Sequence, residues 1–203
     1  MRAAPVAIAE RLGPNPNIMK TNGWISAWCS KIGSSHIEKG LPCQDFSQVK
    51  YIRGANFAIA AVSDGAGSCE NSDTGSRFLV VNAIRKISVR LVRNRFYADG
   101  NPGLDETLWR ELAFGIFTEL KAELGAMAEK EHLDFRSLSA TLILAISDGS
   151  FVACANVGDG RAAFRNRESE WFPMLVPTKG EEANQTLFIT SDLWDCGRDS
   201  EYF

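Results

Sequence analysis

The sequence is poor in the residues that build several common catalytic centres. It has only two histidines, His36 and His132, and its five cysteines include no Cys-x-x-Cys pair. A multi-histidine metal centre is therefore excluded, and neither a zinc knuckle nor a redox pair is indicated. No Gly-x-Ser-x-Gly elbow is present, so the sequence does not indicate a serine hydrolase of that kind. Any chemistry is expected to rest on carboxylates.

Long apolar runs and an excess of one charge are also missing. No apolar stretch approaches the ~20 residues that span a bilayer, and 22 basic residues against 25 acidic ones give a net charge of −3. Neither a membrane nor a nucleic acid is thus an expected partner. Glu10, Arg11 and Pro14 interrupt the N-terminal stretch too early for a secretory signal. We expect a cytoplasmic protein with free thiols, and 203 residues suit one domain.

The order of the expected elements predicts an α+β domain. Two long helices, beginning at Ser72 or Asp73 and at Asp105, separate an early group of strands from a later hairpin with the turn Asp148-Gly149. This order favours helices packed on mainly antiparallel sheets. The strands are expected at 24–30, 46–51, 56–62, 139–146 and 151–157. The apolar stripe of the first helix is expected to consist of Phe78, Val81, Ile84, Ile87 and Leu91.

An acidic turn ends the third expected strand. Residues 60–67 read Ala-Ala-Val-Ser-Asp-Gly-Ala-Gly, so an apolar run stops abruptly at Asp64. Gly65 permits backbone geometry that other residues resist and allows close approach of a ligand. A carboxylate fixed at a strand end is a natural ligand for a hard divalent cation. Asp-Gly is also a common turn pair, so the dipeptide alone leaves both interpretations open.

Three short segments together indicate a family. They read Gly-Leu-Pro-Cys-Gln-Asp at 40–45, Val-Ser-Asp-Gly-Ala-Gly at 62–67 and Asn-Val-Gly-Asp-Gly-Arg at 156–161. In this order, with Ser-Ala-Thr at 139–141, the sequence resembles the metal-dependent Ser/Thr protein phosphatases, the PPM or type 2C family, and most of all their compact bacterial branch. The resemblance implies a layered β-sandwich of mainly antiparallel sheets flanked by two long helices.

The resemblance also implies a chemistry. Such enzymes hold two Mg²⁺ or Mn²⁺ ions, and a water activated by these metals hydrolyses phosphoserine or phosphothreonine in proteins. Asp64 and Asp45 match the catalytic, metal-binding aspartates, and the carbonyl of Gly65 matches a backbone ligand. Asp159 matches a further metal-site carboxylate, with a plain turn as the alternative. The implied partners are a phosphorylated protein substrate and a cognate Ser/Thr kinase.

The group that binds the substrate phosphate is less clear from the sequence. The arginine that precedes the acidic pair in the family is missing, which leaves Lys39 as the nearest candidate and His36 as the second. Arg161 is expected to pair with a surface carboxylate. A basic run on the first helix is expected to be a solvated face, and Trp171 and Trp194 are expected to be packing residues. The basic run consists of Arg85, Lys86, Arg90, Arg93 and Arg95.

The sequence departs from the family pattern in two places. Gln44 stands where many relatives carry a glutamate ligand. Family members carry two more metal-site aspartates, one of them in a second Asp-Gly motif. In the alignment we favour, residues 180–192 correspond to the segment before that motif, so both aspartates are missing. A rival alignment takes residues 190–195 as the motif without its glycine. We therefore expect a loose N-terminal arm at 1–20 and a C-terminally incomplete phosphatase-like domain at 21–203. A non-catalytic module that binds a kinase or a phosphorylated partner is the alternative function.

Overall fold

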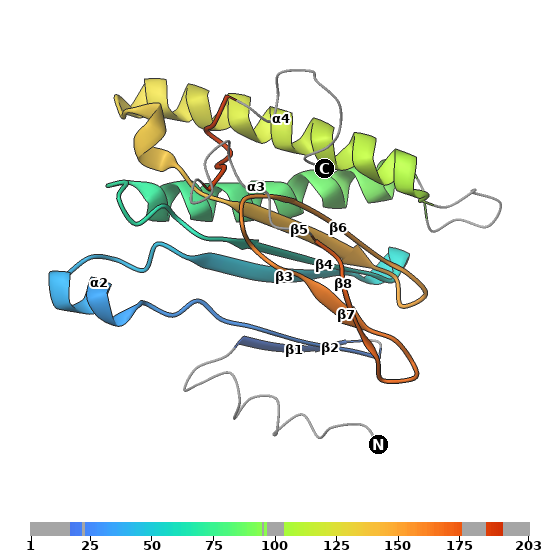
Figure 1. Cartoon of the computed structure of the whole chain (residues 1–203). Helices are drawn as coiled ribbons and strands as arrows, with labels where there is room; N and C mark the ends of the chain where they lie inside the picture. Colours follow the sequence, from blue (N-terminus) through green and yellow to red (C-terminus); the bar gives the residue numbers. More distant parts are fainter. Residues whose placement is uncertain (1–16, 22, 95, 97–103, 176–185, 193–203) are drawn as a thin grey trace.

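The computed structural model describes residues 17–21, 23–94, 96, 104–175 and 186–192 (Figure 1). Two short 3-10 turns, η1 (Arg53–Ala55) and η2 (Phe135–Leu138), join longer elements. The helices are α2 (Ser34–Lys39), α3 (Ser72–Arg93) and α4 (Glu106–Glu131). The strands are β1 (Asn17–Thr21), β2 (Trp24–Trp28), β3 (Phe46–Ile52), β4 (Phe57–Ser63), β5 (Leu142–Ser147), β6 (Val152–Val157), β7 (Ala163–Arg165) and β8 (Trp171–Pro173).

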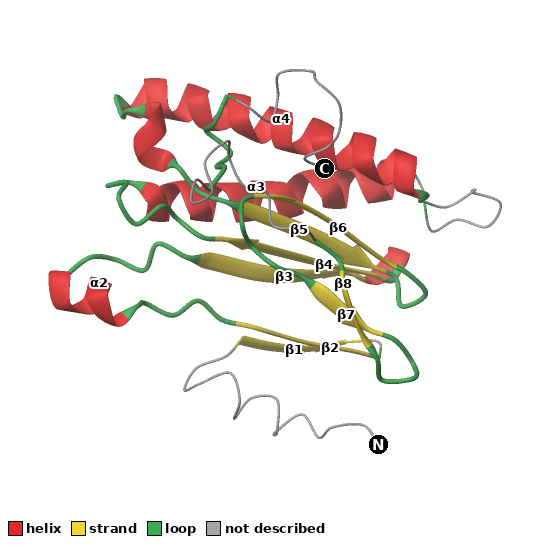
Figure 2. Ribbon diagram, viewed as in Figure 1, coloured by secondary structure: helices red, strands yellow, loops and turns green. Residues whose placement is uncertain are grey.

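The centre of the fold is a four-stranded antiparallel sheet in the order β3-β4-β5-β6. Alternate residues of its strands are buried, as the period of two predicts: Ile59 and Ala61 in β4 and Leu142 and Leu144 in β5 are at most 1% exposed. These side chains face α3 and α4, which cover one face of the sheet (Figure 2). The expected α+β fold with antiparallel sheets and two long helices is confirmed.

Helix α3 is the layer next to the sheet. Its buried apolar positions are Leu79, Val80, Ala83, Ile84, Ile87 and Leu91. The expected stripe was wrong at Val81, which is 42% exposed, because the buried face is centred between Val80 and Ile84 rather than on Val81. Near its beginning the helix contacts η2 so closely that a Cβ on Gly75 would lie 2.0 Å from the carbonyl oxygen of Leu138.

Helix α4 begins where the sequence predicts. Asp105 is its N-cap, and the Asp105 carboxylate accepts a hydrogen bond from the Leu108 amide at 2.8 Å. Such a cap stabilises a helix by about 1 kcal/mol. The acidic side chains of α4 pair with the basic run of α3: Lys86 contacts Glu119 at 2.9 Å and Glu123 at 2.6 Å. The basic run is thus partly neutralised rather than simply solvated, and Arg95 lies outside the described residues.

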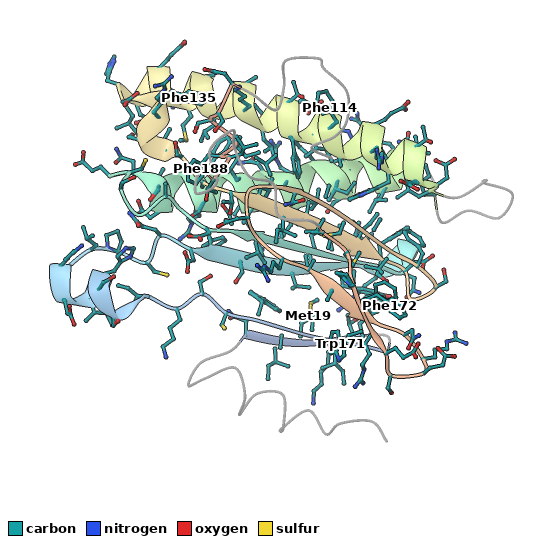
Figure 3. The ribbon with its side chains drawn as sticks, viewed as in Figure 1. Met19, Phe114, Phe135, Trp171, Phe172 and Phe188 are labelled. Atoms are coloured by element: carbon teal, nitrogen blue, oxygen red, sulfur yellow. The ribbon has the colours of Figure 1, made fainter. Side chains whose placement is uncertain are left out.

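Two small hairpins lie on the side of the sheet away from the helices (Figure 1). β1 pairs with β2, and β7 pairs with β8, both antiparallel. Residues 17–20 of the expected loose arm therefore belong to a strand, whereas 1–16 lie outside the described residues. Trp171 (labelled in Figure 3) was expected to pack but is 68% exposed. The Arg165 guanidinium lies over its ring. Trp194 lies outside the described residues.

Two further observations concern membrane spans and cysteines. Among the described residues, no helix is long and apolar enough to cross a membrane. The four cysteines in this part of the chain form no disulfide. Cys154 in β6 is half-buried, and this burial raises the pKa of its thiol to about 12.

Candidate active site

The register of the central sheet brings three aspartates to one end. Phe46 is opposite Ser63, so Asp45 before β3 and Asp64 after β4 are neighbours. On the next strand pair, Leu142 is opposite Val157, which places Asp159 just beyond the same edge. All three side chains are open to solvent. We call Asp45, Asp64 and Asp159 the carboxylate cluster.

The backbone of the acidic turn is braced by Thr141 at the start of the hairpin. The Asp64 amide donates to the Thr141 hydroxyl at 3.0 Å, and the Asp64 carbonyl accepts from the Thr141 amide at 2.9 Å. The Ala66 amide donates to the Ser139 carbonyl at 2.9 Å. Both sides of the turn are therefore bound to one segment from far along the chain, which fixes the backbone that carries the Asp64 side chain.

Gly65 is required for a reason other than its dihedral angles. A Cβ at this position would lie 2.6 Å from the Gln44 carbonyl oxygen and 2.8 Å from the Ser72 carbonyl oxygen. The Gly65 amide donates to that Gln44 oxygen at 3.1 Å. Only glycine therefore fits at this position, because the backbone at Gln44 and Ser72 lies too close for a side chain. The contact with Gln44 also joins the turn to the segment that carries Asp45.

A second glycine positions the third aspartate. Gly158 has φ +117°, and a Cβ there would lie 2.5 Å from the methyl carbon of Thr141. The side-chain amide of buried Asn156 donates to the Gly158 carbonyl at 3.0 Å. The Asn-Val-Gly-Asp sequence therefore makes a tight exit from β6 that turns Asp159 toward the same side as Asp64.

The carboxylates repel one another. Partial burial, the hydrogen-bonding contact with Asp45 and the charges of Asp45 and Asp159 raise the pKa of Asp64 to about 6, in that order of size. In the part of the chain that the structure describes, no three His, Cys, Asp or Glu side chains stand close enough to hold a metal ion by themselves. The arrangement is a close pair, Asp45 and Asp64, with Asp159 farther away.

Gln44 carries an oxygen without a partner. The side chain is 4% exposed, and its amide nitrogen donates to the Cys69 carbonyl at 3.1 Å. The amide oxygen is buried and has no hydrogen-bond partner in the part of the chain that the structure describes. A Cβ on Gly67 would lie 4.0 Å from this oxygen and 3.8 Å from Nε2 of His36. Sequence reasoning noted Gln44 as a departure from the family pattern but did not predict this geometry.

The candidate phosphate-binding residues differ in their placement. His36 on α2 faces Gly67, next to the acidic turn, whereas Lys39 at the end of α2 is exposed. Arg161 does not form the expected surface pair: no described carboxylate contacts it. Arg161 is exposed two residues after Asp159 and lines a groove of about 460 Å³ with four apolar residues. These are Ala162, Ala163, Pro173 and Leu175.

Residues 186–192 close the same end of the sheet, which the sequence did not predict. The Ile189 amide donates to the Ala140 carbonyl at 3.0 Å, and the hydroxyl groups of Ser139 and Thr190 are 2.7 Å apart. Lys121 of α4 lies 3.8 Å from Asp192. The Asp192 side chain is 81% exposed and does not contribute to the pKa change of Asp64. Residue 195 of the rival alignment lies outside the described residues.

Comparison with known proteins agrees with this geometry. The model of the family described as Protein phosphatase 2C matches residues 32–199. Serine/threonine-protein phosphatase 3 of Escherichia coli (strain K12) is 30% identical over 172 residues. The alignment covers 83% of this chain and 64% of that relative, so the chain spans less than two thirds of the relative's length.

Proposed function

Since the chain belongs to the protein phosphatase 2C family, we propose that it hydrolyses phosphoserine or phosphothreonine in proteins with the help of Mg²⁺ or Mn²⁺ held at the carboxylate cluster. Hydrolysis of phosphoproteins agrees with the family and with the name of the E. coli relative. The metal requirement, the residues of the site and a cognate kinase as partner are parts of this proposal.

One observation carries the proposal: Asp45 and Asp64 from neighbouring strand ends form a close pair of carboxylates, and the charge of Asp159 also acts on Asp64. The pKa of Asp64 rises to about 6 because burial and its acidic neighbours disfavour its charged form. A divalent cation would reverse that penalty, and carboxylate and backbone oxygens are the ligands that Mg²⁺ prefers. The donor set thus fits a hard cation at Asp45 and Asp64, with the Gly65 carbonyl and Asp159 as further ligands.

The residues of the chain have distinct roles in this proposal. When bound, the cation would lower the pKa of water and neutralise charge on the phosphoryl oxygens. Asp45 and Asp64 would hold it, and the brace from Thr141 would fix the backbone of Asp64. Arg161 would bind the substrate phosphate, since its guanidinium has no described partner and its planar fork matches two phosphate oxygens.

The test is hydrolysis of a phosphothreonine peptide with Mn²⁺, together with Mn²⁺ binding by calorimetry. Asp64→Asn and Asp45→Asn should each reduce kcat by about 10²-fold or more, because each removes a charged ligand. The matched control is Asp148→Asn, which alters another Asp-Gly turn on the same sheet and should change kcat less than about twofold.

Two outcomes would contradict the proposal. Equal rates in wild type and Asp64→Asn would show that the cluster does not carry the reaction. If the wild-type protein bound a phosphopeptide but neither hydrolysed it nor bound Mn²⁺, the alternative function, a non-catalytic module, would be favoured.

A further inference from the structure

A charged groove lies between the helices α3 and α4. The two helices run side by side over the sheet (Figure 2), and Lys86 of α3 donates hydrogen bonds to both Glu119 and Glu123 of α4. The groove has a volume of about 350 Å³ and is lined by four basic residues, two acidic residues and one valine. It therefore has an excess of two positive charges, in a chain whose net charge is −3.

The two glutamates neutralise the inner part of the groove. Lys86, whose side chain is 11% exposed, lies 2.9 Å from Glu119 and 2.6 Å from Glu123. Arg90, which is 24% exposed, pairs with Glu119 as well. These ion pairs use both carboxylates, so the excess positive charge belongs to the two outer arginines.

The outer arginines are Arg85 and Arg93. Arg85 is 63% exposed and reaches only Glu123, at 3.8 Å, a carboxylate that Lys86 already contacts. Arg93 is exposed, and no carboxylate in the described part of the chain pairs with it. The eight positions from Arg85 to Arg93 correspond to about 12 Å along the helix axis. Val89 lies midway between them, lines the same groove and is 43% exposed.

This pattern of groups fits an acidic peptide. A guanidinium binds a carboxylate through two parallel hydrogen bonds. In an extended peptide, side chains four residues apart lie on one face and about 13 Å apart, and the residue midway between them faces the same way. Two acidic residues with an apolar residue midway therefore match Arg85, Val89 and Arg93.

A nucleic acid fits the groove less well. Its phosphates follow one another at about 3.4 Å along a strand, much closer than the spacing of the two outer arginines. Some of these phosphates would therefore face the carboxylates of Glu119 and Glu123, which line the same groove. Charge repulsion at these carboxylates disfavours a uniformly charged strand.

We propose that Arg85, Val89 and Arg93 form a docking surface for an extended acidic segment of a partner protein, with two carboxylates four residues apart and an apolar residue midway. The two arginines lie roughly 20–30 Å along α3 from Ser72, the helix end that follows the acidic turn. Docking therefore adds affinity for a partner at a distance from the carboxylate cluster, and it does not depend on the proposed phosphatase function.

The test is a titration of the full chain with a peptide of the core sequence Glu-Ser-Leu-Ser-Glu, followed by NMR chemical shifts at about 0.1 M salt, where charges beyond about 10 Å are screened. The shifts should be largest at the amides of α3. Replacement of both peptide glutamates by glutamine should abolish binding. The double variant Arg85→Glu with Arg93→Glu should raise the Kd by about tenfold or more, because two attractive contacts become repulsive.

Two further proteins sharpen the test. Arg53→Glu with Arg167→Glu is the matched control: it makes the same change in net charge at exposed residues of other turns and should change the Kd by less than about twofold. Glu123→Gln removes a carboxylate that opposes Arg85, while Glu119 remains paired with Lys86. It should lower the Kd about threefold.

Several outcomes would overturn the proposal. They are the absence of binding by wild type, equal affinity for the glutamate and glutamine peptides, and an equal rise in Kd in the groove variant and its matched control. Tighter binding of a single-stranded oligonucleotide than of the peptide, lost in the same groove variant, would overturn it in favour of a nucleic-acid surface. Because the readout is binding, a chain that fails to hydrolyse phosphopeptides would contradict the phosphatase function alone.

Discussion

Asp64-Gly65 and Asp148-Gly149 are the same dipeptide at opposite ends of the strands β4 and β5, yet their carboxylates have opposite surroundings. The Asp148 carboxylate accepts hydrogen bonds from the Ser150 amide at 2.8 Å and the Ser150 hydroxyl at 2.7 Å. Asp64 instead faces Asp45 and Asp159. One carboxylate completes its own turn, and the other is left available for a ligand.

The pKa values of the two aspartates shift in opposite directions. Partial burial would raise the pKa of Asp148, but the hydrogen bonds from Ser150 and Phe151 outweigh it and lower that pKa. For Asp64, burial and its acidic neighbours act in the same direction and raise the pKa to about 6. An aspartate in a turn therefore indicates a binding site when neighbouring carboxylates disfavour its charged form. It indicates a structural turn when hydrogen bonds from the turn stabilise its charged form.

The largest difference between the turns is expected from their glycines. Gly65→Ala would place a Cβ 2.6 Å and 2.8 Å from two backbone oxygens that cannot move independently, so we expect a loss of about 3 kcal/mol or more in the free energy of unfolding. Gly149→Ala would meet only the Trp24 ring at 3.8 Å but must adopt φ +94°, which costs about 1 kcal/mol. Urea unfolding of both variants measures the difference, and equal losses would show that the close contact of Gly65 is not what fixes the turn.

Removal of the hydroxyl groups that brace the two turns should change the free energy of unfolding by more similar amounts. Thr141→Val removes the acceptor of the Asp64 amide while keeping the shape of the side chain, and we expect a loss of about 1–2 kcal/mol in the free energy of unfolding with weaker Mn²⁺ binding. Ser147→Ala removes the acceptor of the Gly149 amide at 3.1 Å. It should cost a similar or smaller free energy without affecting Mn²⁺. Calorimetry with both proteins tests this, and unchanged Mn²⁺ affinity in Thr141→Val would argue against the brace.

The smallest effect is a difference in pH dependence without metal. The raised pKa of Asp64 favours folding at low pH, and that contribution is lost as pH rises from its usual 3.8 through about 6. Asp64→Asn should therefore be more stable than wild type above about pH 6 in EDTA, by about 1 kcal/mol after allowance for solvent screening.

Asp148→Asn should show the opposite sign. Its lowered pKa favours folding above the usual value of 3.8, and this contribution is lost as pH falls. The variant should thus be less stable than wild type at neutral pH, by less than 1 kcal/mol. Thermal melts at pH 5 and pH 8 distinguish the two variants. A stability change of the same sign in both, relative to wild type, would contradict the difference between the two turns.

Local patterns were enough to predict much of this molecule. The helix that begins at Asp105, the strand that ends before Asp64 and the hairpin with Asp148-Gly149 follow from periodicity and turn residues. The family resemblance implied that Asp45 and Asp64 share a site, and left Asp159 as a further ligand or a plain turn. The register of the sheet brings the three positions to one end.

Long-range contacts explain what the sequence did not predict. The brace from Thr141, the unpartnered oxygen of Gln44 and the packing of residues 186–192 each depend on segments far apart in the chain. The exposure of Val81 and Trp171 depends on which neighbours cover them, and periodicity does not identify those neighbours. Arg161 was misjudged because a surface pair needs a carboxylate within reach, which only the folded structure can show.

The contact between Ser139 and Thr190 has a consequence for the order of folding. Their hydroxyl groups are 2.7 Å apart but separated by 51 residues of chain, so closing that loop costs entropy that local helices do not incur. During synthesis the central sheet can pair as soon as β6 has emerged, whereas the contact of Ser139 with Thr190 must wait until Thr190 has been made. The sheet can therefore form before this contact does.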